Sequence, residues 1–244
     1  MIESARKSRR KKIGLTPLVE EVTDRLIIEN GYDVIGIPRE MLRTLVQEIV
    51  EDIASQMSSK PKPGPVYNRI KSNISLFEKA LTAKLAENLD GLKGDLVEFI
   101  VTRNPELSSR ITPILYKKLV ELNRDDLIEV LREHWSKTHP ELYLVCPRCR
   151  FKSLTPDFRC LVCGYSPNEE EIREFNNIDR LLDEFIDSQD AESLKKLLLT
   201  GFFYFSDSIR IPEPPQKPFE SMFFLTRRDK ARVISRLREL GEDL

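Results

Sequence analysis

Four cysteines are the residues of this chain whose types and spacing specify a chemistry. They form two Cys-x-x-Cys pairs, Cys146-Pro-Arg-Cys149 and Cys160-Leu-Val-Cys163, with ten residues between the pairs. Two residues between ligands let both thiolates of a pair face one ion, while the intervening backbone amides turn toward the sulfurs. A short hairpin that brings the pairs together gives a tetrahedral S4 site, which suits Zn²⁺ with Zn–S distances of about 2.3 Å.

Because sulfur fills all four positions, the single ion is predicted to be structural rather than catalytic. Iron is the alternative to zinc, since tetrahedral thiolate sites accept both, and redox-active pairs or free thiols are the alternatives to a metal site. Gly164 follows the second pair and can adopt the positive φ that such turns favour, whereas Arg150 holds the equivalent place after the first pair. With the site complete, His134 and His139 are expected to be surface or capping residues.

The segment around the cysteines resembles a zinc ribbon, or a rubredoxin-like pair of knuckles. The resemblance covers residues 141–166 and no other part of the chain. It implies a structural metal and a surface for a partner. The Tyr, Leu, Val and Phe residues around the cysteines predict short strands and turns, and the ion is expected to give shape to a stretch that otherwise lacks a core.

Basic residues gather beside the cysteines and near both chain ends. A zinc ion with four thiolates carries a charge of about −2, so the cations beside it either offset this charge or also meet phosphates. The basic ends are either ordinary solvated segments or further phosphate contacts. The residues predicted to contact nucleic acid are Arg148 and Arg150 beside the cysteines, Arg6, Lys7, Arg9, Arg10, Lys11 and Lys12 near the N-terminus, and Arg227, Arg228, Lys230 and Arg232 in the final helix.

The proline-rich stretch 212–224 resembles, in degenerate form, a sliding-clamp-binding box. In such a box a Gln is followed at +3 by an apolar anchor and at +6 and +7 by aromatic residues. Gln216, Phe219, Met222 and Phe223 fill these places, and they are the predicted protein-binding residues. The alternative is that the aromatic side chains of this stretch pack on the protein's own core.

The composition excludes several classes of protein. Of the 244 residues 40% are hydrophobic, which excludes wholesale disorder, and 39 Lys+Arg against 40 Asp+Glu give a net charge of −1, which excludes a uniformly basic nucleic-acid coat. No apolar run approaches the roughly 18–20 residues needed to span a bilayer, and no apolar stretch follows the N-terminal basic cluster. We therefore expect no membrane segment, no secretory signal and a cytoplasmic location, or a nuclear one in a eukaryote. Two histidines and the absence of glycine-rich phosphate loops argue against an enzyme.

Helical periodicity dominates the rest of the chain. Apolar residues at spacings of three and four predict two helices, after which Lys60–Pro65 is an extended connector to a third helix. Capping boxes are predicted at Ser166–Glu169 and Thr226–Asp229. The predicted helices span 17–30, 38–58, a third up to about 89, 95–103, 105–122 with a possible break at Pro113, 124–137, about 167–188, 190–200 and 227–240.

These patterns predict a mainly α protein, in which a small zinc ribbon with short β strands is embedded between a helical bundle and a C-terminal helical segment. The predicted parts are a basic flexible tail at 1–15, the bundle at 16–140, the ribbon at 141–166, and the C-terminal segment at 167–244 with a Pro/aromatic linker at 201–225. The leading functional hypothesis is a non-enzymatic zinc-binding accessory factor in DNA or RNA transactions, such as replication, transcription or repair. The alternative is a protein–protein adaptor that does not bind nucleic acid, and an enzyme with a dispersed polar site is least favoured.

Overall fold

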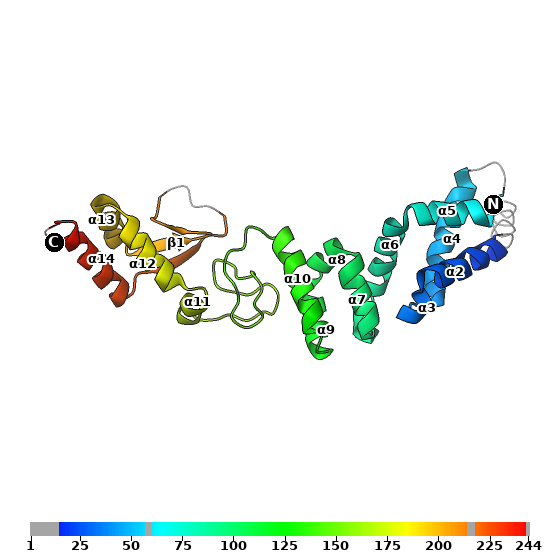
Figure 1. Cartoon of the computed structure of the whole chain (residues 1–244), viewed down its shortest axis with the longest axis horizontal. Coiled ribbons are helices and arrows are strands. Elements are labelled where there is room, and N and C mark those ends of the chain that lie inside the picture. Colours follow the sequence, from blue (N-terminus) through cyan, green and yellow to red (C-terminus); the bar gives the residue numbers. More distant parts are fainter. Residues whose placement is uncertain (1–14, 57–59, 214–217, 243–244) are drawn as a thin grey trace, which may run out of the picture. The chain divides into compact units, whose positions relative to one another are not determined.

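The computed structural model describes residues 15–56, 60–213 and 218–242, and it is mainly helical, as predicted. The chain divides into two compact units, and Figure 1 shows its helices and strands coloured along the sequence. The first unit extends to Ile111 and includes Lys118–Val130, and the second comprises Thr112–Lys117 and the chain from Leu131 onward. Among the described residues no helix is both long and apolar enough to cross a membrane.

The first unit consists of helices that bury apolar residues where neighbouring helices pack against each other. α2 and α4 pack against each other, and Leu42, Leu45 and Val46 of α4 are buried, as the predicted stripe requires. Gly31 ends α2 in the left-handed conformation at φ 66°. The helices up to residue 110 are α2 (Thr16–Asn30), α3 (Tyr32–Ile35), α4 (Arg39–Gln56), α5 (Pro63–Ser72), α6 (Ile74–Ala86), the short 3-10 helix η1 (Leu89–Gly91), α7 (Gly94–Arg103) and α8 (Pro105–Arg110).

Two predictions for this unit are wrong in detail. The extended connector ends at Lys62, because Pro63 and Pro65 lie in the first turn of α5, where proline is tolerated. The predicted long third helix is two helices that are broken at Asn73. The Asn73 side-chain amide donates to the Arg69 carbonyl at 3.0 Å, and such a local bond competes with the helical backbone.

A carboxylate on α2 provides a pH-dependent contribution to stability. Glu29 accepts hydrogen bonds from Arg25, Tyr67 and Lys71. These bonds lower the pKa of Glu29 from 4.5 to about 2, and the bond from Arg25 has the largest effect. A carboxylate with a lowered pKa stabilises the folded state at pH values above its pKa in the unfolded chain. This contribution disappears as the pH falls to its pKa in the folded state. We expect Glu29→Gln to reduce stability at neutral pH and to match the wild type near pH 2. Denaturant unfolding at a series of pH values measures this, with the exposed Glu21→Gln as control; the same pH profile in both variants contradicts the prediction.

The break predicted at Pro113 is confirmed, since α8 ends before it and a new helix begins at Thr112. The C-terminal capping box is confirmed as well, with Thr226 and Asp229 exchanging side-chain and backbone hydrogen bonds. The predicted helix 167–188 is divided at Asn177, which adopts φ 53°, and its capping box is formed by Asn168 and Glu171. The remaining helices are α9 (Thr112–Glu121), α10 (Asp125–Thr138), α11 (Glu169–Phe175), α12 (Ile178–Ser188), α13 (Ala191–Thr200) and α14 (Arg227–Glu239).

The predicted linker at 201–225 contains a three-stranded antiparallel sheet. Its strands are β1 (Phe202–Phe205), β2 (Ile209–Arg210) and β3 (Ser221–Phe224), in the order β2-β1-β3. Within residues 141–166, by contrast, the extended pairing consists of two isolated bridges, Val145 with Lys152 and Leu154 with Cys160. Strand structure in the second unit is therefore concentrated beyond the cysteines.

Candidate metal centre

The four cysteines, which the structure shows as free thiols, converge on one point. Their sulfur atoms all lie within 4.8 Å of one another, with Cys146 Sγ 3.8 Å from Cys163 Sγ and Cys149 Sγ 3.5 Å from Cys160 Sγ. A tetrahedral ion with metal–sulfur bonds of about 2.3 Å places its ligands about 3.8 Å apart. Cys163 is partly exposed and the other three are buried. The donor set and its spacing therefore fit a single metal ion.

Two backbone turns of the same form present these thiols. In the first knuckle the Arg150 N–H donates to the Cys146 carbonyl at 2.8 Å, and in the second the Gly164 N–H donates to the Cys160 carbonyl at 3.1 Å. Arg150 adopts φ 63° and Gly164 adopts φ 72°, so both residues occupy the left-handed region. Arginine at this position therefore leaves the turn unchanged, although a side chain in the left-handed region strains the backbone.

The thiols share their protons unequally. Hydrogen bonds from the thiols of Cys146 and Cys149 favour the Cys160 thiolate and lower the pKa of Cys160. The Ser153 hydroxyl, 3.0 Å from Cys160 Sγ, and the Cys163 N–H, at 3.3 Å, add to this effect. Burial raises the pKa of Cys163 to about 11. Metal binding must displace the remaining protons, so metal affinity falls as the pH falls.

The knuckle segment has more core than its sequence suggested. Phe151 is buried and meets the edge of Tyr116 in α9, with ring centroids 5.6 Å apart. Phe158 contacts Phe223 of β3 at a centroid distance of 5.3 Å. The buried apolar residues of this segment are Leu142, Leu144, Phe151, Leu154 and Val162. The expectation of a coreless stretch is therefore wrong, because neighbouring elements cover it.

The Asn176 side chain joins the first knuckle to α11. Its Oδ1 accepts from the Val145 N–H at 2.8 Å, and its Nδ2 donates to the Val145 carbonyl at 3.0 Å. Asn176 thereby mimics a neighbouring strand, which is a contact that the sequence did not reveal.

The two histidines lie on α10 and just beyond it, outside the cysteine cluster. His139 stacks on Trp135 with ring centroids 3.8 Å apart, and its Nδ1 is 2.9 Å from the Thr138 hydroxyl. Burial lowers the pKa of His134, the side chain of which is half-buried.

The basic residues beside the cysteines are exposed. Arg148, Arg150, Lys152 and Arg159, which we call the knuckle cations, form no ion pair with a carboxylate among the described residues. Arg148 lies over the Tyr165 ring at 5.8 Å from its centroid. These four charges are therefore open to a partner.

Two of the predicted contacts in α14 are already engaged. Arg228 pairs with Asp179 at 3.3 Å and with Asp183 at 2.9 Å, and Arg232 pairs with Asp187. These pairs join α14 to one face of α12.

The other predicted basic residues divide between exposed and undescribed positions. Arg227 and Lys230 are exposed, and no ion pair involves them in the part of the chain that the structure describes. The predicted contacts Arg6, Lys7, Arg9, Arg10, Lys11 and Lys12 lie outside the described residues.

The clamp-box residues are not presented together. Phe223 is completely buried in β3, where its ring stacks on Phe203 at 5.6 Å, so it cannot anchor a partner while the sheet is intact. Phe219 is 43% exposed and Met222 is 39% exposed. Gln216 lies outside the described residues. The structure thus corrects the prediction for Phe223, because this ring belongs to the core.

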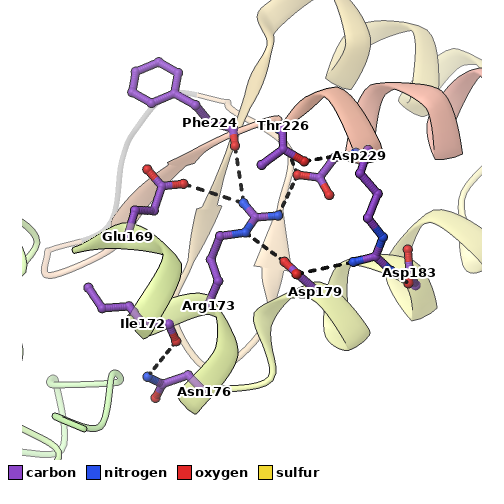
Figure 2. A network of polar contacts seen from close by, with 10 residues as sticks. Glu169, Ile172, Arg173, Asn176, Asp179, Asp183, Phe224, Thr226 and Asp229 are labelled. Carbon is purple, nitrogen blue, oxygen red and sulfur yellow. Dashed lines mark hydrogen bonds and ion pairs between the residues drawn. The ribbon is translucent and has the colours of Figure 1, made fainter. Parts of the chain in front are cut away.

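Sequence reasoning missed a buried charge cluster around Arg173 of α11 (Figure 2). The Arg173 guanidinium contacts Asp229 at 2.6 Å, Asp179 at 2.8 Å and Glu169 at 3.6 Å, and it donates to the Phe224 carbonyl at 3.3 Å. The pKa of Glu169 is raised, mainly because the carboxyl group is partly buried. The cluster joins α11 to α12, β3 and α14, and no spacing in the sequence signals it, because its members are up to 60 positions apart.

No protein-family model, curated protein or solved structure matches this chain at the significance required.

Proposed function

We propose that the cysteines hold one structural zinc ion, and that the protein is a non-enzymatic accessory factor in DNA or RNA transactions. Four sulfur ligands leave no open position for water or substrate, which supports a structural ion. A tetrahedron of sulfur ligands suits zinc or iron. Zinc is not redox-active, which suits an ion with a purely structural role. Cysteines committed to an ion are not free to act as nucleophiles, which supports a non-enzymatic role.

The unpaired knuckle cations carry the nucleic-acid part of the proposal. A zinc ion with four thiolates has a charge of about −2, whereas the knuckle cations Arg148, Arg150, Lys152 and Arg159 together supply four positive charges. Offsetting the thiolates therefore uses half of them. Cations that are exposed and unpaired beside a rigid metal module are suited to hold phosphate oxygens.

We expect the binding of a single-stranded or duplex oligonucleotide to weaken steeply with salt. Each phosphate contact contributes about 0.7 to 0.9 to the slope of log affinity against log salt. Replacing Arg148 and Lys152 by Gln should therefore reduce the slope by about 1.4 to 1.8. The matched control replaces Arg228 and Arg232 by Gln, because it removes the same charge from residues that are paired with α12.

A salt titration by fluorescence anisotropy measures these slopes, zinc content verifies that each variant retains its metal site, and circular dichroism verifies that it retains its helices. The proposal fails if the wild type does not bind at low salt, or if the control loses as much slope as the knuckle variant.

One observation favours the adaptor as the second candidate. An antiparallel sheet with one solvated face normally alternates apolar and polar residues. Here both faces are apolar: Phe203 and Phe223 are buried on one face, whereas Phe224, 57% exposed, and Met222, 39% exposed, lie on the other. If no nucleic acid binds at low salt, this exposed aromatic face makes a protein partner the better account.

A further inference from the structure

The two knuckles have the same backbone but different residues at the left-handed position. Gly164 has no Cβ and adopts this conformation without strain, whereas the Cβ of Arg150 strains the backbone there. Strained residues of this kind persist only where the surroundings hold them in place. We therefore expect neighbouring groups to hold Arg150 in the left-handed conformation.

The peptide unit between Cys149 and Arg150 is held at both ends. Its N–H, from Arg150, donates to the Cys146 carbonyl at 2.8 Å. Its carbonyl, from Cys149, accepts two hydrogen bonds from the Arg132 guanidinium, from Nε at 3.2 Å and from Nη2 at 3.1 Å. A peptide unit fixed at both ends cannot rotate out of the left-handed turn.

Arg132 belongs to α10, outside the knuckle segment, and it is positioned by its own surroundings. Its guanidinium lies 5.5 Å from the centroid of the buried Phe151 ring. One helical turn further on, the Trp135 Nε1–H donates to the Lys152 carbonyl at 2.8 Å. Side chains of α10 thus donate hydrogen bonds to the backbone of the first knuckle at Cys149 and to the segment after it at Lys152.

In the described part of the chain, no side chain holds the second knuckle as Arg132 holds the first. Among the described residues no hydrogen bond to the Cys163 carbonyl is found, and glycine makes one unnecessary there. Within the described ranges, the Arg132 contact is therefore found at the knuckle with the strained residue and not at the knuckle with glycine.

We propose that Arg132 is a positioning residue for the metal, which holds Cys149 in its ligating conformation by fixing the strained Cys149–Arg150 peptide unit. This inference rests on the proposed zinc site and adds a residue to it. It predicts an energetic coupling between Arg132 and Arg150, since glycine at position 150 removes the strain that Arg132 opposes.

The test measures zinc affinity by competition with a chromophoric chelator. Arg132→Met should weaken zinc binding by about 10- to 100-fold, as loss of an outer-shell partner typically does. Adding Arg150→Gly to this variant should recover about fivefold of that loss, whereas Arg150→Gly alone should change the affinity little, because Arg132 already holds the turn. Arg132→Lys keeps the charge but not the planar two-point donor, so its affinity should remain close to that of Arg132→Met. The control is Lys137→Met, which removes one positive charge from an exposed position of the same helix and should leave the affinity unchanged.

Several outcomes overturn the inference while the zinc site itself stands. They are an unchanged affinity in Arg132→Met, full restoration by Arg132→Lys, which would show a purely electrostatic effect, and no recovery on adding Arg150→Gly. If Arg132→Met does not fold, Arg132→Lys with and without Arg150→Gly carries the test, and the fluorescence of Trp135, the single tryptophan, reports the fold. A wild-type chain that does not bind zinc overturns the proposed function instead.

Discussion

Cys160→Ser is expected to weaken zinc binding by about 100-fold and to lower the melting temperature by about 10 °C. Structural zinc sites contribute about 10–16 kcal/mol of binding free energy, so one ligand of four accounts for about 2.5–4 kcal/mol. Cys160 is 2% exposed, and hydrogen bonds from neighbouring groups lower its pKa. Its replacement therefore removes a buried sulfur ligand from the site.

Calorimetric unfolding of the wild type and the variant, each with and without a chelator, measures this effect. The chelator should lower the melting temperature of both chains, and that of the wild type by more, because the variant has less zinc-binding free energy to lose. Equal stability of all four samples would show that no ion contributes to folding.

Arg173→Ala is expected to destabilise the second unit by about 3–5 kcal/mol. Arg173 and Asp229 are 6% and 4% exposed, so the substitution leaves the Asp229 carboxylate buried without its cationic partner (Figure 2). The same substitution also frees the Phe224 carbonyl at the edge of β3. Loss of one partner of a buried pair costs more than loss of both, so the double variant Arg173→Ala/Asp229→Ala should be less destabilised than the sum of the single variants.

Denaturant unfolding measures the free energies, with Arg180→Ala as the control. Arg180 pairs with Glu184 on the surface, where the two side chains are 64% and 58% exposed, and such pairs contribute about 0–1 kcal/mol. If Arg173→Ala lowers the free energy of unfolding by no more than Arg180→Ala does, the cluster does not stabilise the unit.

The sequence predicted those features that depend on neighbours along the chain. The apolar stripe of α4, the end of α2 at Gly31 and the Thr226 capping box each arise from residues within a few positions. The convergence of the cysteines also follows from local spacing, because each pair forms within one turn.

Features that depend on distant partners were not predictable in this way. β1 and β3 are apolar on both faces, so the alternation that marks a half-buried strand is missing, and Phe202–Phe205 gave no strand signal. The pairing of Arg228 with Asp179 needs two helices to meet, and its members are 49 positions apart. Asn73 and Asn177 interrupt helices where the apolar pattern continues, because a polar side chain or a left-handed backbone decides the break locally.

Elemental analysis of the chain, purified without chelators, shows whether the four cysteines hold a metal ion. We expect one zinc ion per chain and four thiols that react with a thiol reagent only after the metal is removed. A chain that contains no stoichiometric metal, with all four thiols reactive from the start, would contradict this expectation.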